Sequence, residues 1–224
     1  MPSEKQITLS HTGLSIMEQC PRCFWLQYHE KLRQPEGFVS RLASRFDILL
    51  KRYFNLFRQN GTLPPFMRGF EGKLENPFQE TYYFELNSRY RFKGKLDDCL
   101  IRPDGTHAPI DHKTSSSDPR GKEAHPSYQK QLNAYSWLLE ENRKKTAGIG
   151  YLIYYYPEET DRFHEGVPMV TEIKTLLTDP EAARRRFLNG VKILEASLPL
   201  SGPECPFCQW REKMEELSAR ELCS

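Results

Sequence analysis

The segment "GKLDDCLIRPDGTHAPIDHKT", residues 94–114, reads as two strand-like runs joined by one tight turn. Pro103, Asp104 and Gly105 suit a three-residue hairpin loop, because proline favours the first position of a type I turn and glycine the left-handed third position. This loop pairs Arg102 with Thr106. The turn chemistry therefore predicts the register of the whole hairpin.

Counting back along both strands sets Asp97 opposite Asp111. Lys113 lies two residues further on and points to the same face, because side chains alternate along a strand. A two-residue loop would instead set Asp97 opposite His112, and the two carboxylates would point apart. The sequence thus predicts two acids side by side with a lysine adjacent.

Two opposed carboxylates repel each other on a half-buried sheet face. A divalent cation resolves that conflict, and hard oxygen ligands suit Mg²⁺ or Mn²⁺. A lysine beside such an ion can position or deprotonate a water and stabilise developing charge. The alternative from the hairpin alone is a surface ion pair on an exposed sheet face, and the two interpretations are evenly matched.

The remaining pattern predicts one α/β domain over residues 1–224, with a central mixed, mainly antiparallel sheet flanked by helices. Apolar residues recur at helical spacing in the clearest helix, at Leu42, Phe46, Leu49, Leu50, Tyr53 and Phe57. The predicted helices are 40–59, 127–142 and 179–198, with a short helical entry and an amphipathic segment in 10–34 and a charged helix at the end of the tail. The predicted strands are 80–86, 90–101, 106–114, 148–157 and 168–175.

The composition excludes some classes of protein. The 224 residues carry 32 basic and 30 acidic side chains, a formal net charge of +2, which does not by itself indicate a nucleic-acid binder. No apolar run approaches the roughly 20 residues that span a bilayer, and the N-terminus lacks the pattern of a signal peptide. We therefore expect a cytoplasmic protein without membrane contact or disulfides.

The order of motifs resembles the PD-(D/E)XK nuclease superfamily, especially its RecB-like and CRISPR-associated exonuclease branch. The pattern is a G-x-x-D strand, here Gly94 to Asp97, then a D-x-K-T strand, here Asp111 to Thr114, and then a helix with Q-x-x-x-Y, here Gln131 to Tyr135. The segments "CPRCFWL" and "CPFCQW" also look like the cysteine segments of that branch. The resemblance covers about residues 10–213.

The resemblance implies metal-dependent hydrolysis of DNA, in a restriction-endonuclease-like fold. Asp97 and Asp111 would be metal ligands, the backbone carbonyl of His112 a third ligand, and Lys113 the catalytic lysine. Gln131 and Tyr135 lie one helical turn apart and could both reach the DNA or the metal. The stripe Tyr128, Leu132, Tyr135 and Leu139 makes core packing an equal alternative for Tyr135.

The family often supplies one more metal ligand from an early helix, commonly His or Glu, and here the helix offers Asp47. Ala43, Asp47, Leu50 and Phe54 share a helical face, so we expect Asp47 on the buried side. A lone buried acid is costly unless it is paired or neutralised. We favour a metal role for Asp47 over a pair with a lysine or arginine.

Two CxxC motifs, Cys20 with Cys23 and Cys205 with Cys208, have the spacing of a soft-metal chelate. Together they would complete a thiolate site that joins residues 10–35 to residues 200–215. The resembling nucleases often hold a [4Fe–4S] cluster with one N-terminal and three C-terminal cysteines, but Met214 stands at the expected last position. A [4Fe–4S] cluster and Zn²⁺ are therefore both alternatives for the ligand of the four cysteines.

The leading hypothesis is a Mg²⁺- or Mn²⁺-dependent DNA nuclease acting in DNA repair, recombination or CRISPR-type processing on single- or double-stranded DNA. The alternative is a non-catalytic accessory subunit of a helicase or recombination complex that keeps the nuclease fold. A third interpretation is a thiolate metalloprotein with coincidental nuclease motifs. Basic clusters at 41–52, 142–145 and 184–186 offer phosphate contacts, although each could be a solvated helix face.

Overall fold

The computed structural model describes residues 6–35, 41–161 and 166–221. By their internal contacts, these residues form two compact units. Of the described residues, the cysteine unit comprises 6–35, 85–92 and 185–221, and the sheet unit comprises 41–84, 93–161 and 166–184. The chain passes between the units several times, so neither is a continuous segment. The single domain expected for 1–224 stays a prediction.

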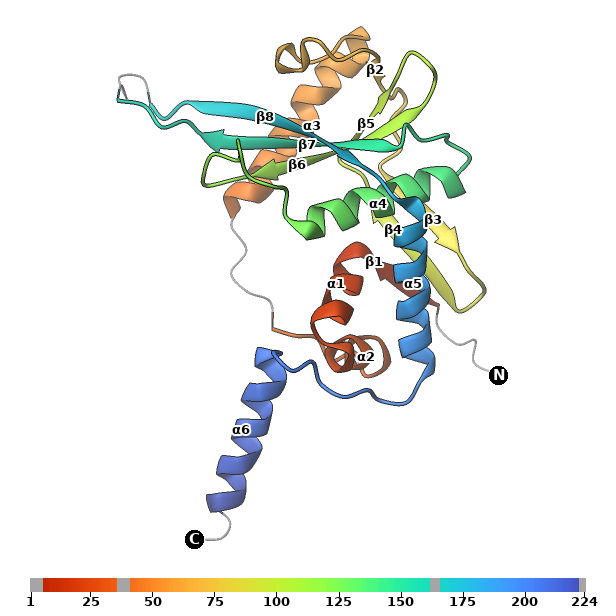
Figure 1. Cartoon of the computed structure of the whole chain (residues 1–224), viewed down its shortest axis with the longest axis vertical. Helices are drawn as coiled ribbons and strands as arrows, with labels where there is room; N and C mark the ends of the chain where they lie inside the picture. Colours follow the sequence, from red (N-terminus) through yellow and green to blue (C-terminus); the bar gives the residue numbers. More distant parts are fainter. Residues whose placement is uncertain (1–5, 36–40, 162–165, 222–224) are drawn as a thin grey trace. The chain divides into compact units, whose positions relative to one another are not determined.

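The sheet unit is built on a five-stranded mixed sheet in the order β2-β5-β6-β7-β8 (Figure 1). Only β6 and β7 pair in parallel, and the other neighbours are antiparallel. This confirms the expected fold class, a mainly antiparallel mixed sheet with helices. The strands are β2 (Lys73–Leu74), β5 (Asp98–Ile101), β6 (His107–Thr114), β7 (Ile149–Pro157) and β8 (Met169–Leu177).

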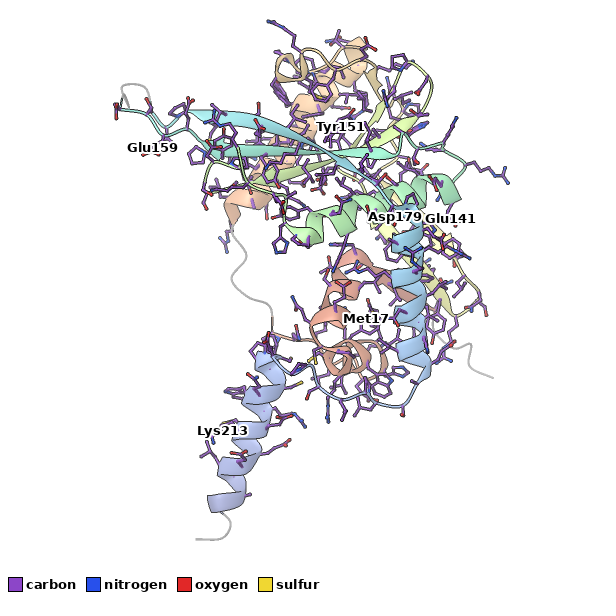
Figure 2. The ribbon with its side chains drawn as sticks, in the orientation of Figure 1. Met17, Glu141, Tyr151, Glu159, Asp179 and Lys213 are labelled. Carbon is purple, nitrogen blue, oxygen red and sulfur yellow. The ribbon has the colours of Figure 1, made fainter. Side chains whose placement is uncertain are left out.

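Helices α3 (Arg41–Asn60) and α4 (Pro126–Glu141) cover opposite faces of this sheet (Figure 1). On one face, α3 contributes Leu50 and Phe54 to a core that includes Ile110 and Tyr151, the latter labelled in Figure 2. On the other face, Leu132 of α4 packs against the strands where Gly150 leaves room. Burial on both faces explains why β7 is an almost continuous run of apolar and aromatic residues.

The first half of α3 differs from the prediction. Leu42 and Leu49 were expected in the apolar stripe, but their side chains are 66% and 43% exposed. The buried residues of the helix are Leu50, Phe54 and Arg58, all from its middle onward. The helix meets the sheet only there, so periodicity correctly predicted the helix but not how much of its stripe is covered.

The hairpin register is confirmed. Asp98 pairs with Ile110 and Ile101 pairs with His107, which is the register that a three-residue loop produces. The Arg102 amide donates to the Thr106 carbonyl at 2.9 Å, and Gly105 has φ of +79°, in the left-handed region. Asp104 accepts hydrogen bonds from the amide and hydroxyl of Thr106. The loop is thus held by the residues whose chemistry predicted it.

The strand expected over 90–101 is two strands that belong to different sheets. Strand β4 (Tyr90–Lys95) lies in a three-stranded sheet of order β1-β4-β3, whereas β5 lies in the five-stranded sheet. The break falls at Leu96 and Asp97. The Leu96 amide still bonds the Glu80 carbonyl, while the next residue is fastened to β6. Competition between two pairing partners bends the chain there, which a propensity argument does not detect.

The cysteine unit contains a short strand and two helices that precede the sheet unit in the chain, and helices that follow it. Strand β1 pairs with β4, which also forms a hairpin with β3 (Thr81–Glu85). The other elements are β1 (Ile7–Ser10), α1 (His11–Gln19), α2 (Pro21–His29), most of α5 (Pro180–Glu195) and α6 (Pro206–Glu221), with the 3₁₀ turn η1 (Pro65–Met67) in the sheet unit. Among the described residues, no helix is long and apolar enough to cross a membrane.

Candidate active site and cysteine cluster

Two carboxylates meet where β5 begins. Asp97 lies at the bend before β5, and its Oδ2 accepts a hydrogen bond from the His112 backbone amide at 2.9 Å. Asp111 precedes His112 on β6. Extending the Asp98–Ile110 pairing by one residue sets Asp111 opposite Asp97. Burial is the main reason that the pKa of Asp111 is raised, and the negative charge of Asp97 adds to this shift. The structure therefore brings together the two acids that the turn predicted.

Asp111 is a buried acid. Its side chain is 1% exposed, and its Oδ2 is in ion-pair contact with Lys113 Nζ at 2.6 Å without the geometry of a normal hydrogen bond. Burial raises the pKa of Asp111 to about 6, Lys113 opposes that shift and Asp97 adds to it. Burial likewise raises the pKa of Asp97, against the His112 amide. A buried acid beside a half-buried one offers carboxylate oxygens that suit a hard divalent cation.

Lys113 connects the acids to helix α4. Its Nζ lies 2.6 Å from Asp111 Oδ2 and donates to Gln131 Oε1 at 3.0 Å. Gln131 Nε2 in turn donates to the Tyr135 hydroxyl at 2.6 Å, and Lys113 Nζ also lies 4.6 Å from the centre of the Tyr128 ring. The chain of contacts from Asp111 to Tyr135 holds the ammonium in one place. The predicted residues are therefore adjacent, while their roles stay predictions.

Gly94 allows helix α4 to approach this closely. A Cβ added at Gly94 would lie 2.3 Å from Leu138 Cδ1 and 3.5 Å from the Tyr135 ring. A glycine in a strand often marks such a close approach. The glycine of the G-x-x-D pattern thus has a packing role, because it lets Leu138 of α4 lie against the strand that leads to Asp97. The Tyr135 ring is 5% exposed, so it packs in the core and also reaches Gln131.

The neighbouring acid Asp98 has a different environment, which sequence reasoning did not address. It points to the other face of the sheet, where Arg58 Nη2 of α3 lies 2.6 Å from its Oδ2. The Cys99 amide donates to the other oxygen. Both side chains are almost completely buried. Asp98 is thus neutralised by protein, unlike Asp97, and a register count alone could have separated the two.

His112 presents different groups to different neighbours. Its ring lies on the α3 face, 4.5 Å from the Phe54 ring, and Nδ1 lies 3.1 Å from the Tyr155 hydroxyl. Burial lowers the pKa of His112 to about 3, so the ring is neutral at physiological pH. Its backbone amide reaches Asp97, while the role of its carbonyl as a metal ligand stays a prediction.

Asp47 is not buried, so the premise of its predicted role is wrong. Its side chain is 51% exposed and pairs with Lys51 one turn along α3, at 3.2 Å. The first half of α3 extends beyond the covered core, which leaves this face in solvent. Its charge nevertheless acts on Asp97 and His112, so it lies within electrostatic reach of the acids. As a metal ligand, Asp47 stays a prediction.

The three basic clusters differ in how far their charges are already used. Lys144 pairs with the buried Glu75, and Arg186 pairs with Glu18 at 2.9 Å. In α3, by contrast, no acid among the described residues pairs with Arg45 or Arg52, and both are exposed. Of the clusters at 41–52, 142–145 and 184–186, the first thus keeps the most charge available for phosphate.

The four cysteines of the CxxC motifs form one cluster in the cysteine unit. All four sulfurs lie within 4.8 Å of one another. The measured separations are 3.8 Å for Cys20–Cys208, 3.6 Å for Cys23–Cys205 and 3.7 Å for Cys23–Cys208. The clustering expected of a thiolate metal site is therefore present. Cys99 is buried in the sheet unit and takes no part.

Backbone amides stabilise the thiolate form of Cys20. The amides of Gly202 and Cys23 contact Cys20 Sγ at 3.2 and 3.4 Å. Burial raises the pKa of the Cys20 thiol, but these amides outweigh it and lower the pKa to about 7. A Cβ at Gly202 would lie 2.2 Å from the Gln19 carbonyl oxygen, so only glycine permits this approach. Such support favours the metal-binding thiolate form.

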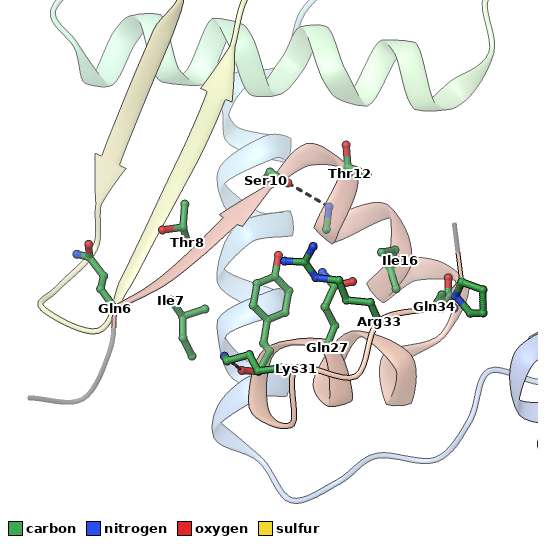
Figure 3. A pocket seen from close by; sticks show the side chains of 13 residues that line it. Gln6, Ile7, Thr8, Ser10, Thr12, Ile16, Gln27, Lys31, Arg33 and Gln34 are labelled. Atoms are coloured by element: carbon green, nitrogen blue, oxygen red, sulfur yellow. Dashed lines mark hydrogen bonds between the residues drawn. The ribbon is translucent and has the colours of Figure 1, made fainter. Parts of the chain in front are cut away.

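The cysteine unit also has a cavity of about 660 Å³ at the start of α1, shown in Figure 3. Lys31 and Arg33 are exposed at its wall, and Gln27 and Thr12 add polar groups. No acidic residue is among the described side chains that line it. Lys31 Nζ donates to the Tyr28 carbonyl at 2.6 Å, which holds that side chain at the wall. Basic and uncharged polar groups thus line this cavity of the cysteine unit.

Comparison with known proteins agrees with this geometry. The family model of the PD-(D/E)XK nuclease superfamily matches residues 42–212, and the chain belongs to this superfamily. A search of curated proteins found no match. The solved structure of SSO0001 is similar at a TM-score of 0.42 and 21% sequence identity, over 84% of this chain and 77% of that chain, which is a loose likeness. Members of the superfamily are generally nucleases that use divalent metals.

Proposed function

We propose that this chain is a divalent-metal-dependent nuclease that hydrolyses phosphodiester bonds in DNA. The observation that carries the proposal is the juxtaposition of Asp97, Asp111 and Lys113 beside the His112 backbone. Repair, recombination or CRISPR-type processing, alone or with a helicase or recombination partner, are the settings that suit such an enzyme. The RecB-like branch is the part of the superfamily that its cysteine motifs favour.

In this proposal, Asp97, Asp111 and the His112 carbonyl would hold Mg²⁺ or Mn²⁺. The bound cation would lower the pKa of a water and polarise the phosphate. Lys113, held by Asp111 and Gln131, would stand where charge develops on the phosphate and stabilise it. Gln131 and Tyr135 would position Lys113, and the exposed arginines of α3 would contact the DNA backbone.

The test is hydrolysis of single- and double-stranded DNA by purified protein with Mg²⁺ or Mn²⁺. We expect cleavage that is abolished by EDTA and by Lys113→Ala, with the fold retained by circular dichroism. Asp104→Asn is a matched control, because Asp104 lies in the same hairpin and an amide oxygen can still accept from Thr106. Full activity of Lys113→Ala would overturn the role of Lys113.

The second candidate function is nucleic-acid binding without hydrolysis. The observation that favours it is that Lys113 already neutralises Asp111, so the site is not forced to take a cation. Tight DNA binding without cleavage, across Mg²⁺, Mn²⁺ and both DNA and RNA substrates, would support this function over the first. Both acids and the lysine are present, which is why hydrolysis is the leading proposal.

For the cysteine cluster, we propose one structural Zn²⁺ rather than a [4Fe–4S] cluster. A tetrahedral ion with metal–sulfur bonds of about 2.3 Å sets its sulfurs about 3.8 Å apart. The sulfur separations of 3.6, 3.7 and 3.8 Å match that value. A four-iron cluster would spread the cysteines further, because each binds a different iron. Elemental analysis of anaerobically purified protein should give zinc, and its spectrum should show no visible absorbance. Iron and a brown colour would overturn the assignment of Zn²⁺.

A further inference from the structure

A second cavity, of about 290 Å³, borders the acids in the sheet unit. It runs from Asp97 past the second half of α3 to the loop after β2. Its volume is at the small end of ligand pockets, which span roughly 300–1,000 Å³. It has space for a single nucleobase and not for a base pair.

The charges at this cavity do not favour a phosphate. The two basic residues, Lys51 and Arg58, are outnumbered by three acids, Glu80, Asp97 and Asp98. Arg58 is already paired with Asp98 at 2.6 Å, and Glu80 with Lys95 at 3.1 Å. The phosphate of a substrate would be drawn to the metal site and to the exposed arginines of α3. The cavity is left for the uncharged part of a nucleotide.

An aromatic ring and two amides give the cavity the groups that recognise a base. Phe78 is half-buried, and the Arg58 guanidinium carbon lies 4.8 Å from its ring centre. The guanidinium lies over one face of this ring, so an unpaired base would stack on the other face. Asn55 uses its Oδ1 to accept from Arg58 and keeps its amide donors, and no described group bonds the Asn76 side chain. These amides can meet base edges.

We propose that this cavity binds one unpaired nucleobase next to the phosphate that is cleaved, with Phe78 as its stacking surface. A base held in a duplex cannot enter such a cavity unless it is extruded from the stack. The preferred substrate is therefore single-stranded nucleic acid or a frayed end. The placement of this base next to a cleaved phosphate rests on the proposed nuclease function, but the binding of a base does not depend on catalysis.

The first experiment measures binding without hydrolysis. Single-stranded oligonucleotides carry 2-aminopurine at successive positions and are titrated with the protein in Ca²⁺. We expect quenching at one position, affinity reduced on the order of 10-fold in Phe78→Leu, and affinity retained in Phe78→Trp. Leucine keeps the apolar volume but has no π face, so the pair separates stacking from packing. Unchanged affinity in a folded Phe78→Leu would overturn the inference.

The second experiment separates this inference from the proposed function. The same proteins are assayed with Mn²⁺ on a single strand and on a blunt hairpin duplex of the same sequence. Faster cleavage of the single strand, lost in Phe78→Leu, supports the inference. Cleavage of both substrates at equal rates overturns it while the nuclease function stands. No cleavage by any variant, with the binding pattern intact, rejects the function and leaves the base-binding site in place.

Discussion

Asp97 Oδ2 accepts a hydrogen bond from the backbone amide of His112 at 2.9 Å. This bond fastens the bend between β4 and β5 onto β6, at the point where the chain leaves one sheet for the other. It also sets the first of two acids across from Asp111. The same contact thus shapes the fold and places the charges on which the proposed chemistry depends.

The first prediction concerns the charge of Asp97. Asp97→Asn keeps an oxygen that can accept from the His112 amide but removes the negative charge. We expect a folded protein with much weaker Mn²⁺ binding and at least about 100-fold lower cleavage, because a catalytic metal supplies several kcal/mol. Calorimetric titration of Mn²⁺ and a nuclease assay test this. Wild-type Mn²⁺ affinity in the variant would contradict Asp97 as a ligand.

Gln131 is predicted to act by positioning Lys113. Gln131→Leu removes the acceptor at 3.0 Å from the ammonium while keeping the side-chain volume. We expect kcat to fall about 10- to 100-fold, in the range for loss of an orienting partner, with Mn²⁺ affinity nearly unchanged. Gln131→Glu, which keeps an acceptor for Lys113, should restore part of the rate. Equal loss of metal binding and kcat would show a different role.

A third prediction addresses stability. Asp98→Ala leaves the buried Arg58 without its partner and should lower the free energy of unfolding by about 3–5 kcal/mol. The double variant Asp98→Leu with Arg58→Met removes both charges and should recover much of that loss. Asp118→Ala, which breaks an exposed pair with Arg120 in the same unit, should barely change the urea midpoint. A mild effect of Asp98→Ala would mean that water reaches Arg58.

The fourth prediction tests how the cysteine cluster is built. Gly202→Ala places a Cβ against the Gln19 carbonyl and pushes the Gly202 amide away from Cys20. We expect less bound metal per chain and a lower melting temperature. Cys99→Ala is the control, because Cys99 lies outside the cluster and should leave the metal content unchanged. Full metal occupancy in Gly202→Ala would show that the loop relaxes without cost to the site.

Much of the active-site hairpin could be predicted because its determinants are local. Turn residues that follow one another in the chain set the register, and strand alternation then places Asp97, Asp111 and Lys113. The break at Leu96 could not be predicted in this way. It depends on two sheets that compete for the same strand, and Glu80 and His112, which hold either side of the break, are distant in sequence.

Burial was the harder property to predict for single residues. Helical periodicity put Asp47 on a buried face, yet α3 extends past the core and Asp47 lies in solvent. The same helix brings Arg58 to Asp98, a pair 40 residues apart that no local pattern indicates. A helical stripe shows which residues share a face, and only tertiary contact decides how much of that face is covered.

By itself, the sequence determined the class of fold, the register of the hairpin and the chelate spacing of the two cysteines in each CxxC motif. These properties follow from neighbouring residues and from the regular alternation of side chains along helices and strands. Tertiary structure alone decided that Asp98 pairs with Arg58 of α3, whereas Asp111 pairs with Lys113 beside Asp97. It also decided the sulfur separations and the cavity beside Phe78. Those properties depend on distances between segments far apart in the chain, which are set only when the core packs.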